Sequence, residues 1–269
     1  MNFAAADSEN YLADLADTRG IQWRPMRISA LLLLASALWA QAPAPAPPPP
    51  LPPPLVNVAR IISDYADLHR YAAENARVPP PAPGEERVVF MGDSITDGWG
   101  RRVGQFFPGK PYINRGISGQ VTSQMLLRFH PDVILLKPKA VLILAGTNDI
   151  GGNLGPTPLE VIEDNLAAMT EMAQANRIKV ILAALQPVCD YHRPQTQTRP
   201  PEKIVALNGW IKEYTGKNGL GFVDYYSATV DDKGMFRAEL TDDGLHPNAK
   251  GYDVMAPLAA KAIAAAVAK

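Results

Sequence analysis

The sequence predicts an α/β fold in which a central, mainly parallel sheet of five strands is covered by helices on both faces. Five short runs are apolar throughout, as expected of strands that are buried on both sides. Segments with the three-to-four spacing of amphipathic helices separate these runs. This alternation is typical of parallel sheets, in which a helix crosses from one strand to the next.

The elements follow each other from residue 88 to the end of the chain. Strands are expected at residues 88–91, 112–113, 141–145, 180–185 and 221–225. Thr157-Pro158-Leu159-Glu160 has the pattern of a capping box with proline at the first helical position, which predicts a helix through Met172. Apolar residues spaced over 204–214 predict another helix. Residues 249–268 predict a last, alanine-rich helix that is interrupted at Pro257.

The first 54 residues are expected to form a targeting signal followed by a linker, and not part of the folded domain. Met26 and Arg27 precede thirteen uncharged residues, 28–40, which suit a secretory signal but are shorter than the roughly 20 residues of a membrane span. We expect residues 1–40 to be an N-terminal extension and signal peptide, with translation starting at Met26 and cleavage near Ala40. The mature chain is then secreted or periplasmic, without a stable membrane span. Nine of the fourteen residues 41–54 are proline, which predicts an extended linker.

Residues 55–86 are expected to lead into the main folded domain, 87–269. Val58, Ile62, Tyr65, Leu68 and Ala72 recur at helical spacing, and a second proline cluster follows. The pattern predicts an amphipathic helix that packs on the domain.

Charge and cysteine content exclude several classes of function. The net charge is −1 and no long basic run occurs, so nothing indicates a nucleic-acid partner. The single cysteine, Cys189, permits neither an intrachain disulfide nor a thiolate metal cluster, and we expect an inert thiol.

Ser94 is a candidate nucleophile because it follows the first predicted strand, within "MGDSITDGWG". A serine after a strand is also a common helix cap, so the assignment depends on a base elsewhere in the chain. His246 follows a loop, with Asp243 three residues before it and Gly244 between them. This spacing lets one loop present an imidazole while its own carboxylate holds the other ring nitrogen.

Two further loops offer groups that could stabilise an oxyanion. Gly119 lies in "NRGISGQ" after the second strand, and Asn148 lies in "LAGTNDI" after the third. A backbone N–H beside a glycine and a side-chain amide are typical donors for this purpose. Taken singly, a turn glycine and an Asx turn explain the two residues equally well.

In combination, these motifs resemble the GDSL or SGNH hydrolases. The blocks Gly92-Asp93-Ser94, Ser118-Gly119, Gly146-Thr147-Asn148-Asp149 and Asp243-Gly244-Leu245-His246 occur in the order of that family. The resemblance implies a flavodoxin-like three-layer α/β/α sandwich and no metal or organic cofactor. It also implies Ser94 as nucleophile, His246 as base, Asp243 as its orienting acid, and the N–H groups of Ser94 and Gly119 with the Asn148 amide as oxyanion hole. Gln120 departs from the family, which commonly has aspartate there.

The resemblance implies a serine esterase acting on carboxylic esters. We expect short acyl groups, such as acetyl, on small molecules or carbohydrates; the alternatives are a lysophospholipase or thioesterase with longer acyl preference, or a sugar O-acetyltransferase. Loop 186–202 is expected to border the substrate pocket with Tyr191, His192, Arg193 and Arg199, and Trp99 is expected to border it as well. A solvent-exposed loop and a core aromatic residue are the competing interpretations.

Overall fold

A computed structural model describes residues 62–268, which belong to one unit of the chain, Leu51–Lys269. The predicted signal peptide and the proline-rich linker lie outside the described residues.

The core of this unit is a five-stranded sheet in which all neighbouring strands run parallel, as expected from the sequence. Its spatial order is β2-β1-β3-β4-β5, so the chain reverses direction across the sheet after β2. Phe90 of the central strand β1 pairs with Asn114 of β2 on one side and Leu142 of β3 on the other. The strands are β1 Val88–Gly92, β2 Tyr112–Gly116, β3 Ala140–Leu144, β4 Lys179–Ala183 and β5 Gly221–Val223.

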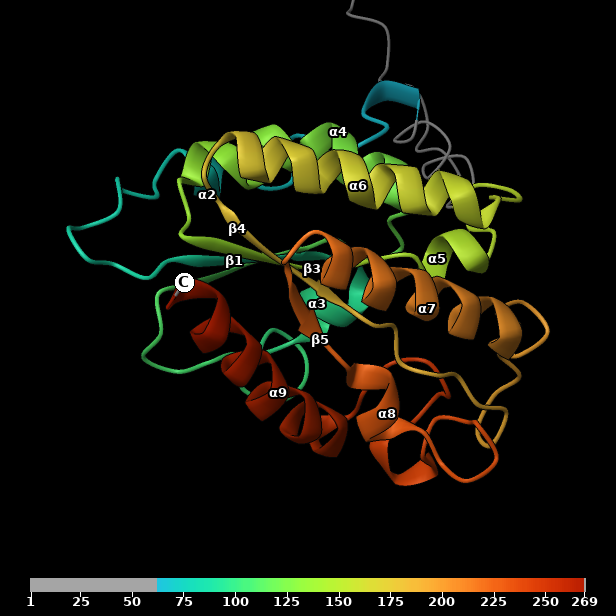
Figure 1. Cartoon of the computed structure of the whole chain (residues 1–269). Helices are drawn as coiled ribbons and strands as arrows, with labels where there is room; N and C mark the ends of the chain where they lie inside the picture. The colour runs from blue at the N-terminus through green and yellow to red at the C-terminus, as the bar shows by residue number, and fades with distance from the viewer. Residues whose placement is uncertain (1–61, 269) are drawn as a thin grey trace, which may run out of the picture. The chain divides into compact units, whose positions relative to one another are not determined.

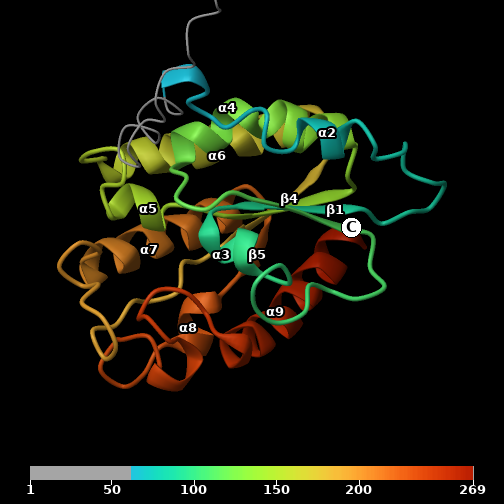
Figure 2. The ribbon, with the colours of Figure 1, turned by 180° about the vertical axis from the view of Figure 1, so that it is seen from behind.

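Helices cover both faces and complete the predicted three layers. Right-handed crossovers place α4 (Thr122–Asp132), α6 (Leu159–Ala175) and α7 (Pro201–Lys217) on one face. Helices α3 (Ser94–Gly98) and α9 (Ala249–Val267) lie on the other. Figure 1 shows α4 and α6 above the sheet and α9 below it, and Figure 2 shows the same layers from behind. Short helices are α2 (Ala72–Asn75), α5 (Thr147–Ile150) and α8 (Tyr225–Thr229), with 3₁₀ turns at Ile134–Leu136 and Ala238–Leu240.

The core is built from the apolar runs that predicted the strands. Every residue of β1 and β3 is buried. Leu207 and Ile211 of α7 are at most 1 % exposed, as are Leu166 and Met169 of α6. Burying each such side chain contributes roughly 1.5–3 kcal/mol to the free energy of unfolding. The sheet is therefore a stable framework for the loops at its carboxyl edge.

Two features of the helices differ from the prediction: the interruption of α9 and the cap of α6. Helix α9 continues through Pro257, which lies on its exposed side, where water can solvate the carbonyl that loses its N–H partner. The N-cap of α6 is Pro158, and Thr157 forms no capping box because its Oγ donates to the Gly155 carbonyl instead.

The predicted helix before the domain is interrupted in the part that the structure describes. Ile62 and Ser63 are helical, but turns then follow as far as α2. The Asp64 carboxylate accepts hydrogen bonds from the N–H groups of Leu68 and His69, and Asp67 has a left-handed φ of 57°. Side-chain acceptors of this kind compete with helical hydrogen bonds, which explains why the apolar spacing alone misled.

Candidate active site

Ser94 is the first residue of α3, directly after β1. The cap of this helix is Asp93, whose Oδ1 accepts the Ile95 N–H at 2.9 Å. The Ser94 hydroxyl therefore has no capping role, and it lies 2.9 Å from Nε2 of His246. As the first helical residue, Ser94 also has a backbone N–H without an acceptor in the helix.

A short loop before α9 holds His246 against Asp243. Nδ1 of the imidazole lies 2.7 Å from Asp243 Oδ2. The other oxygen, Oδ1, accepts the backbone N–H groups of Leu245 at 2.9 Å and His246 at 2.8 Å. One carboxylate thus fixes both the turn and the ring of the histidine that it precedes.

The ionised form of Asp243 is strongly favoured. Burial raises the pKa of Asp243, but the hydrogen bonds from the His246 ring and from two backbone N–H groups outweigh it and bring the pKa to about 2. An ionised carboxylate only accepts, so Nδ1 of His246 carries the hydrogen and Nε2 is left to accept from the Ser94 hydroxyl.

Asp242, the neighbouring carboxylate, does not contact the imidazole. Its Oδ1 accepts from Nδ2 of Asn248, at 3.0 Å. Ser118, the other serine in a family block, is bonded to Asp97 and Arg102 and has no histidine partner.

The predicted loop 186–202 ends at residue 200, because α7 begins at Pro201, and it supports the turn that carries the histidine. Gly244 has φ +86°, and a Cβ there would lie 2.2 Å from the Cys189 carbonyl, so only glycine fits. The Cys189 N–H donates to the Gly244 carbonyl at 2.9 Å, and Nε2 of Gln195 donates to the Asp243 carbonyl at 3.1 Å. The sequence indicated that this loop borders the pocket but gave no sign that it braces Asp243.

Gly119 and Asn148 follow β2 and β3, at the same edge as Ser94. Gly119 has φ +82°, and within the part of the chain that the structure describes no heavy atom outside residues 118–120 lies within 4 Å of the position that a Cβ would take. Asn148 is buried in α5, and its Nδ2 donates one hydrogen to the Gln120 carbonyl at 3.0 Å. The second amide hydrogen remains for another acceptor.

Buried polar residues fix the glycine loop. Both carboxylate oxygens of Asp149 accept the Thr122 N–H at 3.0 Å, and Oδ1 also accepts the Thr122 hydroxyl. The Gln120 side chain accepts from Nε of Arg128 and donates to the Ala66 carbonyl at 2.8 Å. The residue that departs from the family is therefore hydrogen-bonded through both its amide oxygen and its amide nitrogen.

Three of the predicted pocket residues lie in different environments. Trp99 is 2 % exposed and packs on Phe90 and Tyr252, so it is a core aromatic residue and not a pocket wall. Tyr191 is exposed and donates to Asp231. His192 is exposed and lines a surface cavity of about 550 Å³ that also includes Asp242 and Asn248.

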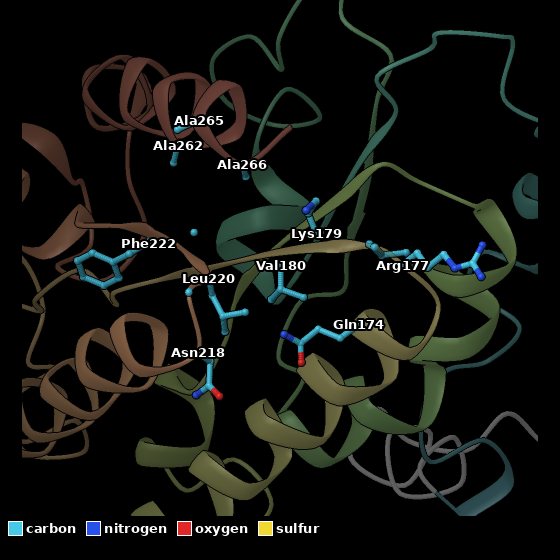
Figure 3. Close-up of a pocket in the computed structure, with 13 residues that line it drawn as sticks. Gln174, Arg177, Lys179, Val180, Asn218, Leu220, Phe222, Ala262, Ala265 and Ala266 are labelled. Carbon is cyan, nitrogen blue, oxygen red and sulfur yellow. The ribbon is translucent and has the colours of Figure 1, made fainter. Parts of the chain in front are cut away.

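A second cavity, of about 510 Å³, lies near the amino ends of β4 and β5. Figure 3 shows Lys179 and Val180 of β4, Phe222 of β5 and Ala262 of α9 around it. Sites in open parallel sheets lie at the carboxyl ends, so this cavity is remote from the candidate active site.

Among residues 62–268 no group of His, Cys, Asp and Glu side chains is arranged to hold a metal ion. Within the same range, no helix has the length and apolar character needed to cross a bilayer.

Comparisons with known proteins found similar chains. A GDSL-like lipase from Bacteroides thetaiotaomicron is 43 % identical, with a TM-score of 0.70, covering 75 % of this chain and 99 % of that one. An acetylxylan esterase from Xylanibacter ruminicola is 27 % identical over 68 % of this chain and 44 % of its own length. A lipoprotein from Bacillus subtilis is 30 % identical over 40 % of this chain and 51 % of its own. The chain spans about half the length of these two curated relatives.

The family comparison covers all four motif blocks. The model of the GDSL-like lipase/acylhydrolase family matches residues 90–254, from the strand before Ser94 to the helix after His246. The chain belongs to the GDSL-like lipase/acylhydrolase family, which places it among the carboxylic ester hydrolases.

Proposed function

We propose that this protein is a serine esterase that cleaves carboxylic esters through an acyl-enzyme on Ser94. The observation that carries the proposal is the line of hydrogen bonds from Ser94 Oγ through His246 to Asp243, of 2.9 Å and 2.7 Å. A serine hydroxyl is a weak nucleophile and needs a base at this distance. The base in turn needs a carboxylate to fix its tautomer and to stabilise its protonated form.

The first half of the reaction forms the acyl-enzyme. Ser94 Oγ attacks the ester carbonyl while Nε2 of His246 takes the hydroxyl proton. The N–H groups of Ser94 and Gly119, with the free amide hydrogen of Asn148, stabilise the oxyanion that develops. The tetrahedral intermediate then collapses, and the alcohol leaves with the proton from His246.

The second half restores the enzyme. Water attacks the acyl carbonyl as His246 takes one of its protons, and the carboxylic acid departs as Ser94 recovers its hydrogen from the imidazole. Asp243 stays ionised throughout, in agreement with its pKa of about 2.

For the substrate we infer short acyl esters, such as acetyl groups on carbohydrates. Acetylxylan esterases from X. ruminicola, 27 % identical, and Geobacillus stearothermophilus, 24 % identical, support this class. We further propose export from the cytoplasm, which the apolar segment at residues 28–40 and the relation to a B. subtilis lipoprotein support.

Hydrolysis of p-nitrophenyl esters from acetate to palmitate tests the proposal. Ser94→Ala should abolish nearly all of the rate, leaving at most the ~10³–10⁴-fold acceleration over water that binding and oxyanion stabilisation supply. Ser118→Ala is the matched control and should lose far less activity, because among the described residues the Ser118 hydroxyl is hydrogen-bonded to Asp97 and Arg102 and to no histidine. Wild-type rates in Ser94→Ala would rule out the nucleophile. A preference for long acyl chains would indicate a lipid-directed enzyme and contradict the proposal of an acetyl esterase. Release of acetate from acetylated xylo-oligosaccharides tests the carbohydrate substrate class directly.

A further inference from the structure

Arg199, at the end of loop 186–202, lies beside the candidate oxyanion hole. Its guanidinium packs against Gly151, the residue that ends α5. A Cβ at position 151 would lie 2.8 Å from both Cζ and Nη2 of Arg199. The glycine thus leaves the space that the guanidinium fills, three residues after Asn148.

The guanidinium has only neutral hydrogen-bond partners among residues 62–268. Nη2 donates to Oδ1 of Asn148 at 3.4 Å, and Nη1 donates to Gln195 Oε1 at 3.4 Å and to Thr198 Oγ at 3.3 Å. Nε is buried without a partner in this range, and Arg199 forms no ion pair there. Burial lowers the pKa of Arg199, while the charges of Asp93 and Asp243 oppose this. A cation is therefore kept partly desolvated at the site, where the charges of Asp93 and Asp243 act on it but no carboxylate of the described residues is hydrogen-bonded to it.

The contacts of Asn148 explain what this cation does. The Asn148 amide is hydrogen-bonded through both of its polar atoms: Nδ2 donates to the Gln120 carbonyl and Oδ1 accepts from Arg199. A guanidinium can only donate, so it forces the amide oxygen toward loop 186–202. The nitrogen, with its free hydrogen, then faces the glycine loop.

We propose that Arg199 is a positioning residue that orients and polarises the Asn148 amide for oxyanion stabilisation. The inference rests on the proposed function, in which Asn148 donates to the oxyanion. A charged donor on Oδ1 draws electron density from the amide and makes its N–H a stronger donor in a site of low dielectric. The 3.4 Å contact suits this role, because catalytic hydrogen bonds commonly tighten as the transition state forms.

A double-mutant cycle between Arg199 and Asn148 tests the proposal, with p-nitrophenyl acetate as substrate. Asn148→Ala should lower kcat by about 10²–10³-fold, the usual loss for one oxyanion donor. Arg199→Gln should lower kcat by about tenfold to a hundredfold with KM nearly unchanged, and Arg199→Lys by less. The double variant should be no slower than Asn148→Ala alone, because Arg199 acts only through the amide.

A second variant separates positioning from loss of folding. Gly151→Ala keeps every charge but pushes the guanidinium from its place, and should reproduce most of the loss in kcat. In a protein that already carries Arg199→Ala, Gly151→Ala should lower kcat little further.

Three results would overturn the proposal. Losses that multiply in the double variant would mean that Arg199 acts independently of Asn148. A rise in KM confined to an anionic ester, p-nitrophenyl hemisuccinate compared with p-nitrophenyl butyrate, would make Arg199 a substrate-binding residue. Full activity in Asn148→Ala, with Ser94→Ala inactive, would remove the oxyanion role and this inference with it, while leaving the nucleophile in place.

Discussion

The Asp93 carboxylate should make the stability of this protein fall with rising pH. Asp93 is 1 % exposed, its Oδ1 caps α3, and its Oδ2 has no hydrogen-bond partner among the described residues. Burial raises the pKa of this carboxyl from 3.8 to about 6, against the opposing effect of the Ile95 N–H. Asp93→Asn retains an acceptor for the cap and removes the charge.

The pKa change sets the size of the effect. A rise from 3.8 to about 6 corresponds to about 3 kcal/mol favouring the protonated form in the fold. Because the folded-state pKa is the higher one, the unfolding free energy falls as pH rises from about 4 to about 6 and stays lower above. Between pH 4 and pH 8 the loss comes to about 2 kcal/mol. Asp93→Asn lacks this loss, although its unpaired amide N–H₂ adds a pH-independent cost of about 1–3 kcal/mol.

Urea unfolding of both proteins at pH 4, 6 and 8 measures the difference. The stability of Asp93→Asn minus that of the wild type should rise by about 2 kcal/mol from pH 4 to pH 8. Asp149→Asn is the comparison, and it should be less stable at every pH because the Thr122 N–H and hydroxyl lose a shared carboxylate acceptor. If the stability of Asp93→Asn minus that of the wild type stays constant or falls as pH rises, burial does not raise the pKa of Asp93 as argued.

Three further substitutions test other parts of the structure. Asp243→Asn should lower kcat by about 10⁴-fold in the ester assay, because the imidazole loses the acceptor that fixes its tautomer; a loss of less than tenfold would contradict this. Tyr71→Phe should cost about 1–3 kcal/mol in urea unfolding, since the buried hydroxyl donates to the Gly116 carbonyl and accepts from Arg101; an unchanged midpoint would count against it. Gly244→Ala should lower both kcat and the melting temperature, because its Cβ would meet the Cys189 carbonyl, and normal values for both would exclude the clash.

The sequence predicted the sheet and the Asp243–His246 pair because both depend on local patterns, whereas the contact of His246 with Ser94, 152 positions away, was implied by the resemblance of the motif blocks to a family. Runs that are apolar throughout fix buried strands, and parallel strands bring the residues that follow them to one edge. The turn from Asp243 to His246 is closed by its own carboxylate, so its geometry needs no distant contact.

The misplaced elements depend on contacts between residues far apart in the chain. Trp99 is taken into an aromatic cluster by Phe106 and Tyr252, and no spacing rule for short segments shows this. Arg199 was expected at the pocket, but its contact with Asn148 was not predicted, because it joins residues 51 positions apart. The spacing of apolar residues does not predict such pairs, because they meet only when the edge of the sheet is assembled.

Gln120 shows how one departure from a family pattern can be explained by an element outside the family blocks. Arg128 is fully buried and already has a carboxylate partner, Asp132, at 3.0 Å. An aspartate at position 120 would place a second negative charge beside this pair, and its acceptors could not serve the Ala66 carbonyl. Glutamine provides both an acceptor for Nε of Arg128 and a donor for Ala66, at 2.5 Å and 2.8 Å. The backbone carbonyl of Gln120 also accepts from the Asn148 amide, so a single residue connects the segment before the domain to the candidate oxyanion hole.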